Sequence, residues 1–152
     1  MFDSTSGEAS GEKNVKLLLA VAASCLFVMS ACGPGAQSGQ PTVNVTLDEY
    51  HVQLSSDSIG ASKVTFQITN SGHEKHEFVI LRTDITPEAL PVTQTGKVTE
   101  EGTAIAHVDE IDGVSPGEKK TLTVDLKPGT YLLICNYPGH VHSGMAAFFV
   151  VT

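Results

Sequence analysis

Basic residues are scarce in this sequence. Lys and Arg number 9 against 17 Asp and Glu, which gives a formal net charge of −8 over 152 residues. The few basic residues are not concentrated in any stretch, whereas a protein that follows a phosphate backbone needs a basic patch or stripe. The composition therefore excludes nucleic-acid binding. The length fits one domain of the usual size, about 100–150 residues, rather than two.

Cysteine is scarce as well. The three cysteines stand at positions 25, 32 and 135, two of them near the start of the chain. An odd number in this distribution does not build the disulfide framework of a small secreted domain. Cys135 therefore stands alone in the body of the protein.

The apolar run near the start is too short to cross a bilayer. It covers the 13 residues from Leu17 to Met29 and follows Lys13 and Lys16. A membrane-spanning helix needs about 20 apolar residues, whereas the core of a signal peptide needs about 7–15. We therefore interpret residues 1–31 as an export signal.

The segment Met29-Ser-Ala-Cys-Gly33 resembles the bacterial lipobox, with small residues at the two positions before Cys32. Met29 stands where leucine is commonest. The resemblance implies cleavage before Cys32, lipid on its thiol and acylation of its amine. Two alternatives stay open: cleavage after Ala31 that releases a soluble protein, or an uncleaved anchor. Cys25 lies within the apolar run and is discarded after either cleavage.

Residues 33–41, GPGAQSGQP, have the composition of a flexible linker, because none of them is a large apolar residue. We place the lipid-attachment cysteine and this linker at 32–41 and a single folded domain at 42–152.

Apolar residues in the domain follow the two-residue period of β-strands. Three segments alternate apolar with polar residues and predict half-buried strands, and three are continuously apolar and predict inner strands. The alternating segments are 43–47, 64–68 and 122–126, and the continuous ones are 78–81, 131–135 and 146–151. With turn signals between them, they predict an all-β fold, an antiparallel Greek-key β-sandwich of seven or eight strands.

One region departs from this pattern. Residues 84–102 contain Pro87, Pro91 and Gly96 and show no strand period. We interpret the region as an inserted loop with one short helical turn near Pro87 to Leu90.

The chemistry is concentrated near the C-terminus. A thiol, an imidazole and a thioether occur within eleven residues, at Cys135, His140 and Met145. Soft sulfur with imidazole selects copper among the common metals, and a His2Cys plane with a long axial Met is the blue-copper arrangement. His76 is the candidate second histidine, because a turn gives way there to an inner strand.

Each of these residues also has an ordinary structural interpretation. A buried cysteine is usually a small core residue, and a nearby methionine usually fills a packing gap. Their joint spacing with two histidines favours a metal site instead. His51, His73 and His107 lack a partner at metal spacing, and His142 should point away from His140; we expect all four at the solvent side. The acidic run 109–112 lacks the calcium-loop pattern, so we expect a solvated turn.

The sequence resembles the cupredoxins, specifically the single-domain plastocyanin and azurin group. The resemblance rests on Cys-x4-His-x4-Met, on Pro138-Gly139 within it, and on the segments 128–131 and 76–79, and it covers the domain from Thr42 onward. It implies one copper ion that alternates between Cu(I) and Cu(II), with equatorial ligands and one axial ligand. The implied equatorial ligands are His76, Cys135 and His140, and the axial ligand is Met145.

Two positions depart from that group. Glu77 replaces an asparagine that ties the two ligand segments together in plastocyanins and azurins, which leaves the hydrogen bonding around the ligands undefined. Lys75 replaces a glycine whose carbonyl approaches the metal in azurin, so a fifth ligand is not implied.

We expect a one-electron carrier outside the cytoplasmic membrane, lipid-anchored at the periplasmic or extracytoplasmic face of a bacterial membrane. The expected partners are redox proteins, such as a cytochrome or an oxidase or reductase, which meet the protein at the edge formed by His140, Tyr137, Pro138 and Val141. The alternative is a copper delivery or storage protein that uses the same ligands.

We do not expect an enzyme. Multicopper oxidases and copper nitrite reductases resemble the domain but need further copper ions, held by paired His-x-His elements or at a subunit interface. One His140-Val-His142 cannot supply them, and a binuclear copper centre would need a second cysteine beside Cys135.

Overall fold

The structure is a computed structural model that describes residues 39–60 and 62–152. The predicted export signal, Cys32 and the linker up to residue 38 lie outside the described residues. In the described part of the chain, no helix has the length and apolar character needed to cross a membrane.

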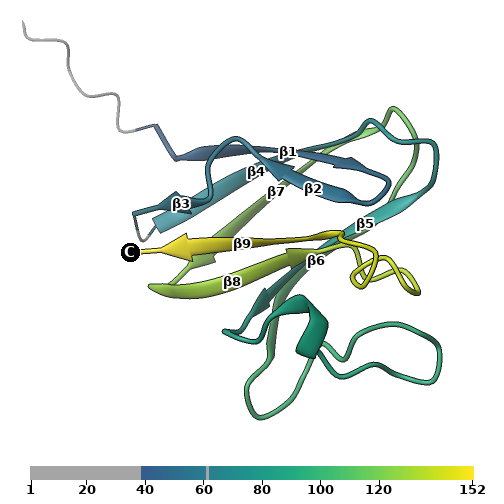
Figure 1. The fold of residues 1–152 in the computed structure, drawn as a ribbon. Helices are drawn as coiled ribbons and strands as arrows, with labels where there is room; N and C mark the ends of the chain where they lie inside the picture. The colour runs from purple at the N-terminus through teal and green to yellow at the C-terminus, as the bar shows by residue number, and fades with distance from the viewer. Residues whose placement is uncertain (1–38, 61) are drawn as a thin grey trace, which may run out of the picture. The chain divides into compact units, whose positions relative to one another are not determined.

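Two β-sheets pack face to face (Figure 1). One sheet has the order β2-β1-β4-β7, formed by His51–Leu54, Thr42–Asp48, Ser62–Asn70 and Lys119–Leu126. The other has the order β3-β9-β8-β5-β6, formed by Ser58–Ile59, Ala146–Val151, Gly129–Ile134, His76–Arg82 and Ala106–Val114. The all-β sandwich that the sequence predicts is confirmed.

Strand number and direction differ from the prediction. The described residues form nine strands rather than seven or eight, and both sheets are mixed. β1 runs parallel to β4, with Val43 opposite Phe66, and β3 runs parallel to β9. The additional strands are short or irregular: β2 has four residues and β3 has two, too few for a two-residue period to stand out.

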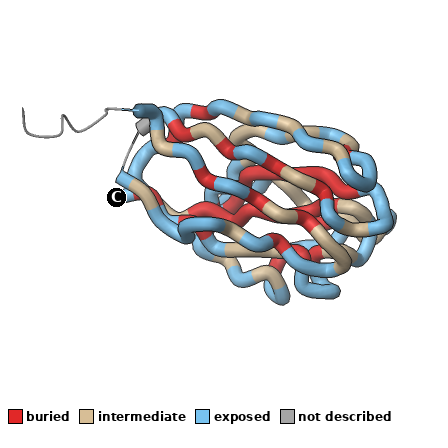
Figure 2. Tube along the Cα trace, turned by 90° about the horizontal axis from the view of Figure 1, so that it is seen from above, coloured by how far each residue is buried: buried red, intermediate tan, exposed pale blue. Residues whose placement is uncertain are grey.

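The core lies between the sheets, where the buried residues gather (Figure 2). Phe66 is at its centre, with its ring centroid 5.3 Å from that of Phe78 and 5.4 Å from that of Phe149. The predicted alternation is confirmed in β1, where Val43, Val45 and Leu47 are buried. β9 lies inside its sheet as predicted, yet only one of its faces is buried, because Phe148 and Val150 are exposed.

β5 and β8 are covered on both faces. The segment between β5 and β6 crosses the outer face of their sheet and places Leu90, Val98 and Ile105 against it, in a second apolar cluster with Leu81 and other residues of both strands. This segment, residues 83–105, contains the inserted loop predicted at 84–102. It contains the predicted helical turn as a 3-10 helix at Pro87–Ala89. The loop is therefore a third layer over part of the sandwich.

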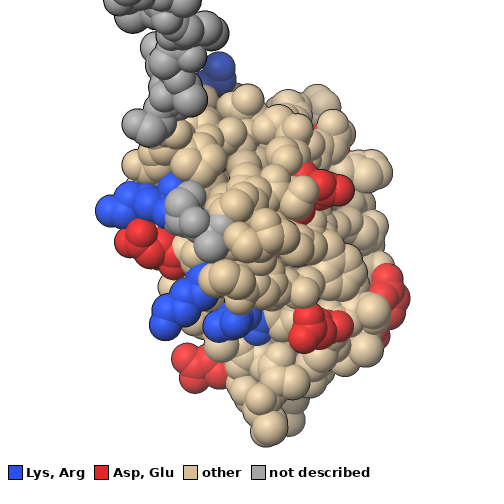
Figure 3. Space-filling view, turned by 90° about the vertical axis from the view of Figure 1, so that its left-hand side faces the viewer, with Lys and Arg blue, Asp and Glu red and all other residues tan. Residues whose placement is uncertain are grey.

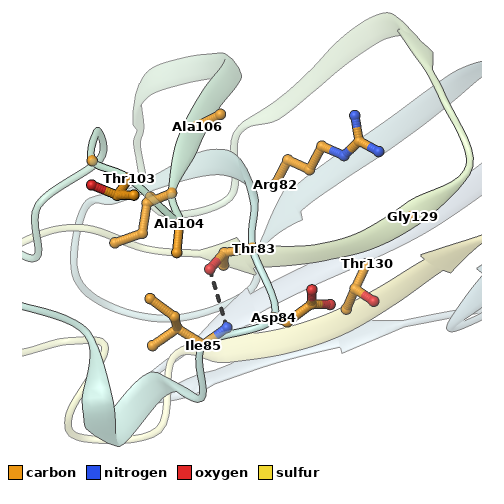
Figure 4. Close-up of a pocket in the computed structure, with 11 residues that line it drawn as sticks. Arg82, Thr83, Asp84, Ile85, Thr103, Ala104, Ala106, Gly129 and Thr130 are labelled. Atoms are coloured by element: carbon orange, nitrogen blue, oxygen red, sulfur yellow. Dashed lines mark hydrogen bonds between the residues drawn. The ribbon is translucent and has the colours of Figure 1, made fainter.

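A hollow of about 540 Å³ lies where the inserted loop leaves β5 and rejoins β6. Figure 4 shows it between Arg82 to Ile85, Thr103 to Ala106, and the first residues of β8. The Ile85 N–H donates to Thr83 Oγ1 at 3.1 Å and fixes its rim. Cys135 follows the other end of β8, about 20 Å away at 3.3 Å per residue. The hollow is thus remote from the predicted metal ligands.

Candidate metal centre

The four predicted ligands come from one end of the sandwich. His76 is the first residue of β5, and the other three lie in the loop 135–145 between β8 and β9. Figure 1 shows this loop at the end opposite the C-terminus, beside the connection that enters β5. The Cys135 N–H donates to the Met145 carbonyl at 3.1 Å, one step beyond the last strand pair, Ile134 opposite Ala146. The loop is therefore closed at its base like a hairpin.

A tight turn places His140 within this loop. Gly139 has a φ of +81°, a conformation that glycine adopts without steric cost. The His140 N–H donates to the Tyr137 carbonyl at 3.0 Å, and the His140 carbonyl accepts from the Met145 N–H at 3.0 Å. Backbone bonds on both sides thus fix the imidazole relative to Cys135 and Met145.

Both histidines turn the same ring nitrogen toward the cysteine sulfur. Cys135 Sγ lies 3.7 Å from His76 Nδ1 and 3.4 Å from His140 Nδ1. His76 and Cys135 are fully buried, while the His140 side chain is 12% exposed. The structure therefore brings three of the predicted ligands together as two nitrogens and one sulfur.

These separations fit a bound metal ion. For an ion about 2.0 Å from nitrogen and 2.3 Å from sulfur, a trigonal angle separates the two donors by about 3.7 Å. The observed values lie at or just below that. Met145 is fully buried and its carbonyl pairs with the Cys135 N–H, so the donor set at this end is two imidazoles, a thiol and a thioether. This is the set that copper prefers, and a copper ion bound here would supply one-electron chemistry.

The Cys135 sulfur accepts a hydrogen bond from the Glu77 N–H at 3.4 Å. Burial raises the pKa of the Cys135 thiol, and the backbone N–H groups of Glu77 and Tyr137 oppose that rise. The thiol therefore keeps its proton in the metal-free protein and releases it on metal binding. Burial lowers the pKa of His140, aided by the neighbouring His76, which keeps that imidazole neutral and ready to bind.

Each histidine has a carboxylate at its other ring nitrogen. His76 Nε2 lies 3.3 Å from Glu49 Oε1, and His140 Nε2 lies 3.6 Å from Glu74 Oε2. The first contact is an ion-pair approach without aligned hydrogen-bond geometry, since Nε2 of His76 has no hydrogen-bond partner among the described residues. Glu49 is itself held by the N–H groups of Glu74 and His73, both at 2.7 Å. The Glu74 N–H is the main reason that the pKa of Glu49 falls to about 2. Carboxylates in this position orient metal-binding imidazoles.

The residues that follow two of the predicted ligands both reach the inserted loop. Glu77 is buried, and its carboxylate lies 3.4 Å from Lys97 Nζ. Burial raises the pKa of Glu77, opposed by Lys97. The buried Asn136 amide accepts from the Val98 N–H at 2.7 Å and donates to the Val98 carbonyl at 3.0 Å. The two ligand segments are therefore tied to the inserted loop at 97–98.

Sequence reasoning missed these supporting residues. The sequence pattern marks Glu77 only as a departure from plastocyanins and azurins, and it does not single out Glu49, Lys97 or Asn136. Each is distant in sequence from the group it contacts, so no local spacing could have found them. The sequence offers one signal for them. Glu77 directly precedes the apolar segment 78–81, and an acidic residue buried there needs an opposite charge as its partner.

The remaining histidines divide into two groups. His51 and His73 have side chains that are 69% and 98% exposed, and His142 is exposed, as predicted. The His107 side chain is 29% exposed, and the prediction that it lacks a partner is wrong, because its imidazole lies between Glu100 and Glu110. The acidic run 109–112 is part of β6 rather than a solvated turn.

Aromatic rings surround the exposed edge of His140. Its ring centroid is 5.1 Å from that of Tyr50 and 5.8 Å from that of Tyr137, both edge to face. Pro138 is exposed and Val141 is buried. Three of the residues predicted at this edge line it, and Tyr50, between β1 and β2, is an addition.

Comparison with solved structures finds blue copper proteins of the same fold. The dithionite-reduced auracyanin from Roseiflexus castenholzii is 21% identical with a TM-score of 0.55, and covers 74% of this chain and 98% of its own. Auracyanin A, a "blue" copper protein from Chloroflexus aurantiacus, is 19% identical with a TM-score of 0.56, covering 75% and 100%. Reduced rusticyanin is 21% identical with a TM-score of 0.51, covering 74% and 80%.

Further comparisons concern a larger copper enzyme, curated protein sequences and a domain family. The multicopper oxidase McoA from Aquifex aeolicus is 16% identical with a TM-score of 0.50, and the match covers only 30% of its chain. No curated protein sequence matches the chain. The cupredoxin resemblance stated from the sequence is confirmed, and proteins of this type bind one copper ion. Residues 53–152 match the sulfocyanin (SoxE) domain family over most of the folded part, and the chain belongs to that family of cupredoxin-type blue copper proteins.

Proposed function

We propose that the protein is a one-electron carrier, with His76, Cys135 and His140 as equatorial copper ligands and Met145 as the axial ligand. The observation that carries the proposal is the convergence of two Nδ1 atoms on Cys135 Sγ, at 3.4 and 3.7 Å. A site already arranged for its ion needs little rearrangement when that ion changes oxidation state.

Rigid supports around the donors favour this role over delivery. His76 lies in a central strand and Cys135 directly follows one. The ion-pair contact to Glu49 and the bonds of Asn136 to the inserted loop restrain the same end. A delivery protein needs a loop that opens to release Cu(I), and a loop held by this many contacts opposes release.

The edge at His140 is the proposed route for the electron and the proposed contact for a partner. It combines an imidazole that is 12% exposed with the rings of Tyr50 and Tyr137. Figure 3 shows the opposite end of the domain, where the surface is largely uncharged and Lys and Arg lie beside Asp and Glu at its margins. We propose redox proteins as partners, such as a cytochrome or an oxidase or reductase, and a carrier rather than an enzyme.

The proposed location is the outer face of a bacterial cytoplasmic membrane. It is supported by the export-signal pattern of residues 1–31, by the lipobox resemblance at Cys32 and by the linker composition of 33–41. In this arrangement the linker would leave the copper domain free to meet partners at the membrane surface.

One experiment separates a carrier from a delivery protein by measuring both the protection of the ligand loop and the rate of electron exchange. Amide hydrogen exchange is recorded on the metal-free and Cu(I) forms of the full chain, beside electron exchange with a small redox protein and Cu(I) transfer to a chelator. We expect protection to differ by less than about tenfold, confined to 136–144, with rapid electron exchange. An unprotected metal-free loop, with fast Cu(I) transfer and slow electron exchange, would support delivery instead.

Substitutions at Met145 test the axial assignment. A thioether in this position is a weak donor that tunes the potential more than it holds the metal. Met145→Leu should keep copper and colour and raise the reduction potential, whereas Met145→Gln should lower it, because an amide oxygen favours Cu(II). We expect at least about 59 mV between the two variants, a tenfold change in the one-electron equilibrium. Protein-film voltammetry measures this, and equal potentials or loss of copper from Met145→Leu would exclude the axial role.

A further inference from the structure

A second group of metal-binding side chains lies outside the copper centre. Glu100 of the inserted loop and His107 and Glu110 of β6 bring their ligand atoms within 4.8 Å of one another. His107 Nε2 lies 3.8 Å from Glu100 Oε2 and 3.5 Å from Glu110 Oε2. One imidazole and two carboxylates thus converge from two segments of the chain.

A β-bulge explains how residues three apart on a strand meet. In a regular strand, His107 and Glu110 would point to opposite faces. The pairing of β6 with β5 shifts here: Ile80 lies opposite Asp109, while the next residue, Leu81, lies opposite His107. The extra residue, Val108, reverses the alternation and brings the two side chains to one side.

The imidazole nitrogen at the centre of this group is unsatisfied. His107 Nε2 is buried and has no hydrogen-bond partner within the described residues. With a proton, it would close on one oxygen to the 2.7–2.9 Å of a charge-assisted hydrogen bond. Without one, its lone pair faces two carboxylates. A cation bound by the three groups would give this nitrogen a partner and would separate its lone pair from the negative carboxylates.

The group has supporting contacts of its own. The Asn136 amide donates to Glu100 Oε1 at 2.7 Å, which holds that carboxylate and leaves Oε2 toward His107. A hollow of about 480 Å³ borders all three residues and gives room for water as a further ligand. Lys97 also lines it, but its ammonium lies 3.4 Å from the Glu77 carboxylate.

We propose that Glu100, His107 and Glu110 form a second metal site, for a divalent transition-metal ion of the zinc type. A tetrahedral ion with bonds of about 2.1 Å separates its ligands by about 3.4 Å, and the distances from His107 to the two carboxylates, 3.5 and 3.8 Å, lie slightly above this value. An imidazole with carboxylates suits such an ion, whereas magnesium and calcium take oxygen ligands alone. The proposal does not depend on the electron-carrier function.

This site is linked to the copper centre through Asn136, which follows Cys135 and holds Glu100. A divalent ion adds positive charge beside the segment that carries the thiolate, so it favours Cu(I) over Cu(II). The reduction potential therefore rises when the site is filled. By linkage, reduction of copper tightens binding of the second ion.

Calorimetric titration with zinc chloride tests the site. The full chain is first loaded with one equivalent of copper and desalted, so that zinc cannot enter the His76, Cys135 and His140 site. We expect one zinc ion per chain and at least a tenfold weaker affinity in both His107→Ala and Glu110→Gln. His51→Ala, which removes an exposed histidine on β2, should bind zinc as the unmodified chain does. The copper potential should rise with zinc in the unmodified chain and stay constant in His107→Ala.

Two results would overturn the proposal. One is zinc binding in both variants as tight as in the unmodified chain, which would place the ion elsewhere. The other is no binding at millimolar zinc, which would make the group an ion pair only. Glu110→Gln keeps the test decisive if His107→Ala loses its fold, because the Glu110 side chain is 39% exposed and its replacement has nearly the same shape.

Discussion

Cys135→Ser should abolish the intense visible absorption of the Cu(II)-loaded protein. That band requires a short Cu(II)–thiolate bond, and Cys135 is the one cysteine among the described residues. A serine hydroxyl stays protonated at neutral pH and is a poor copper ligand. It can still accept the hydrogen bond from the Glu77 N–H, so we expect the unfolding free energy to fall by only about 1–2 kcal/mol. Absorption spectroscopy and urea unfolding of the metal-free form measure the two effects.

The chain offers a matched control for this substitution. Cys32→Ser changes a cysteine that the sequence places before the folded domain, so it should leave the colour unchanged. A coloured Cys135→Ser protein would refute the thiolate assignment, as would a Cys32→Ser protein that had lost its colour. Loss of colour together with loss of the cooperative unfolding transition would instead mean that Cys135 is needed for the fold.

Asn136→Ala should destabilise the domain by about 2–4 kcal/mol. The amide satisfies both backbone groups of the buried Val98 and one carboxylate oxygen of Glu100. Alanine would leave the N–H and the carbonyl of Val98 unpaired in a buried setting, and each such group costs about 1–3 kcal/mol. Urea unfolding of the metal-free chain measures the change, and hydrogen exchange should show the loss at residues 97–100.

Gln94→Ala is the control, because this residue is exposed in the same loop. Its effect should stay within about 0.5 kcal/mol. If Asn136→Ala were as mild as Gln94→Ala, the inserted loop would be held by apolar contacts alone. The hydrogen bonds of Asn136 to that loop would then contribute nothing measurable to the free energy of unfolding.

The ligand loop could be predicted from the sequence because its donors are close together in the chain. Cys135, His140 and Met145 lie between two strongly apolar strands, and His76 begins a third, so local pattern placed all four near strand ends. The groups that support them could not be predicted in this way. Glu49, for example, meets His76 through a connection between β1 and β2 that only the tertiary fold brings near.

Several errors in the fold come from the irregular pairing of β6. β6 could not be recognised in the sequence because its register with β5 shifts twice, between His76 and Phe78 and between Ile80 and Leu81. Each shift breaks the two-residue period on which strand prediction relies. The same irregularity made the acidic run at 109–112 look like a turn, and it concealed the meeting of His107 with Glu110. The two parallel pairs, β1 with β4 and β3 with β9, were not predicted either, since periodicity says nothing about which neighbours pair.

The backbone hydrogen bond from Cys135 to Met145 closes the loop between them at its base, so that the loop forms a separate module. Its base is fixed by the adjacent pairing of β8 and β9, so residues added or removed beside His140 would not shift either strand. Of the four ligands, only His76 comes from another part of the sandwich. Evolution could therefore vary the length and chemistry of this module, and with them the potential and the partner, while the scaffold stays the same.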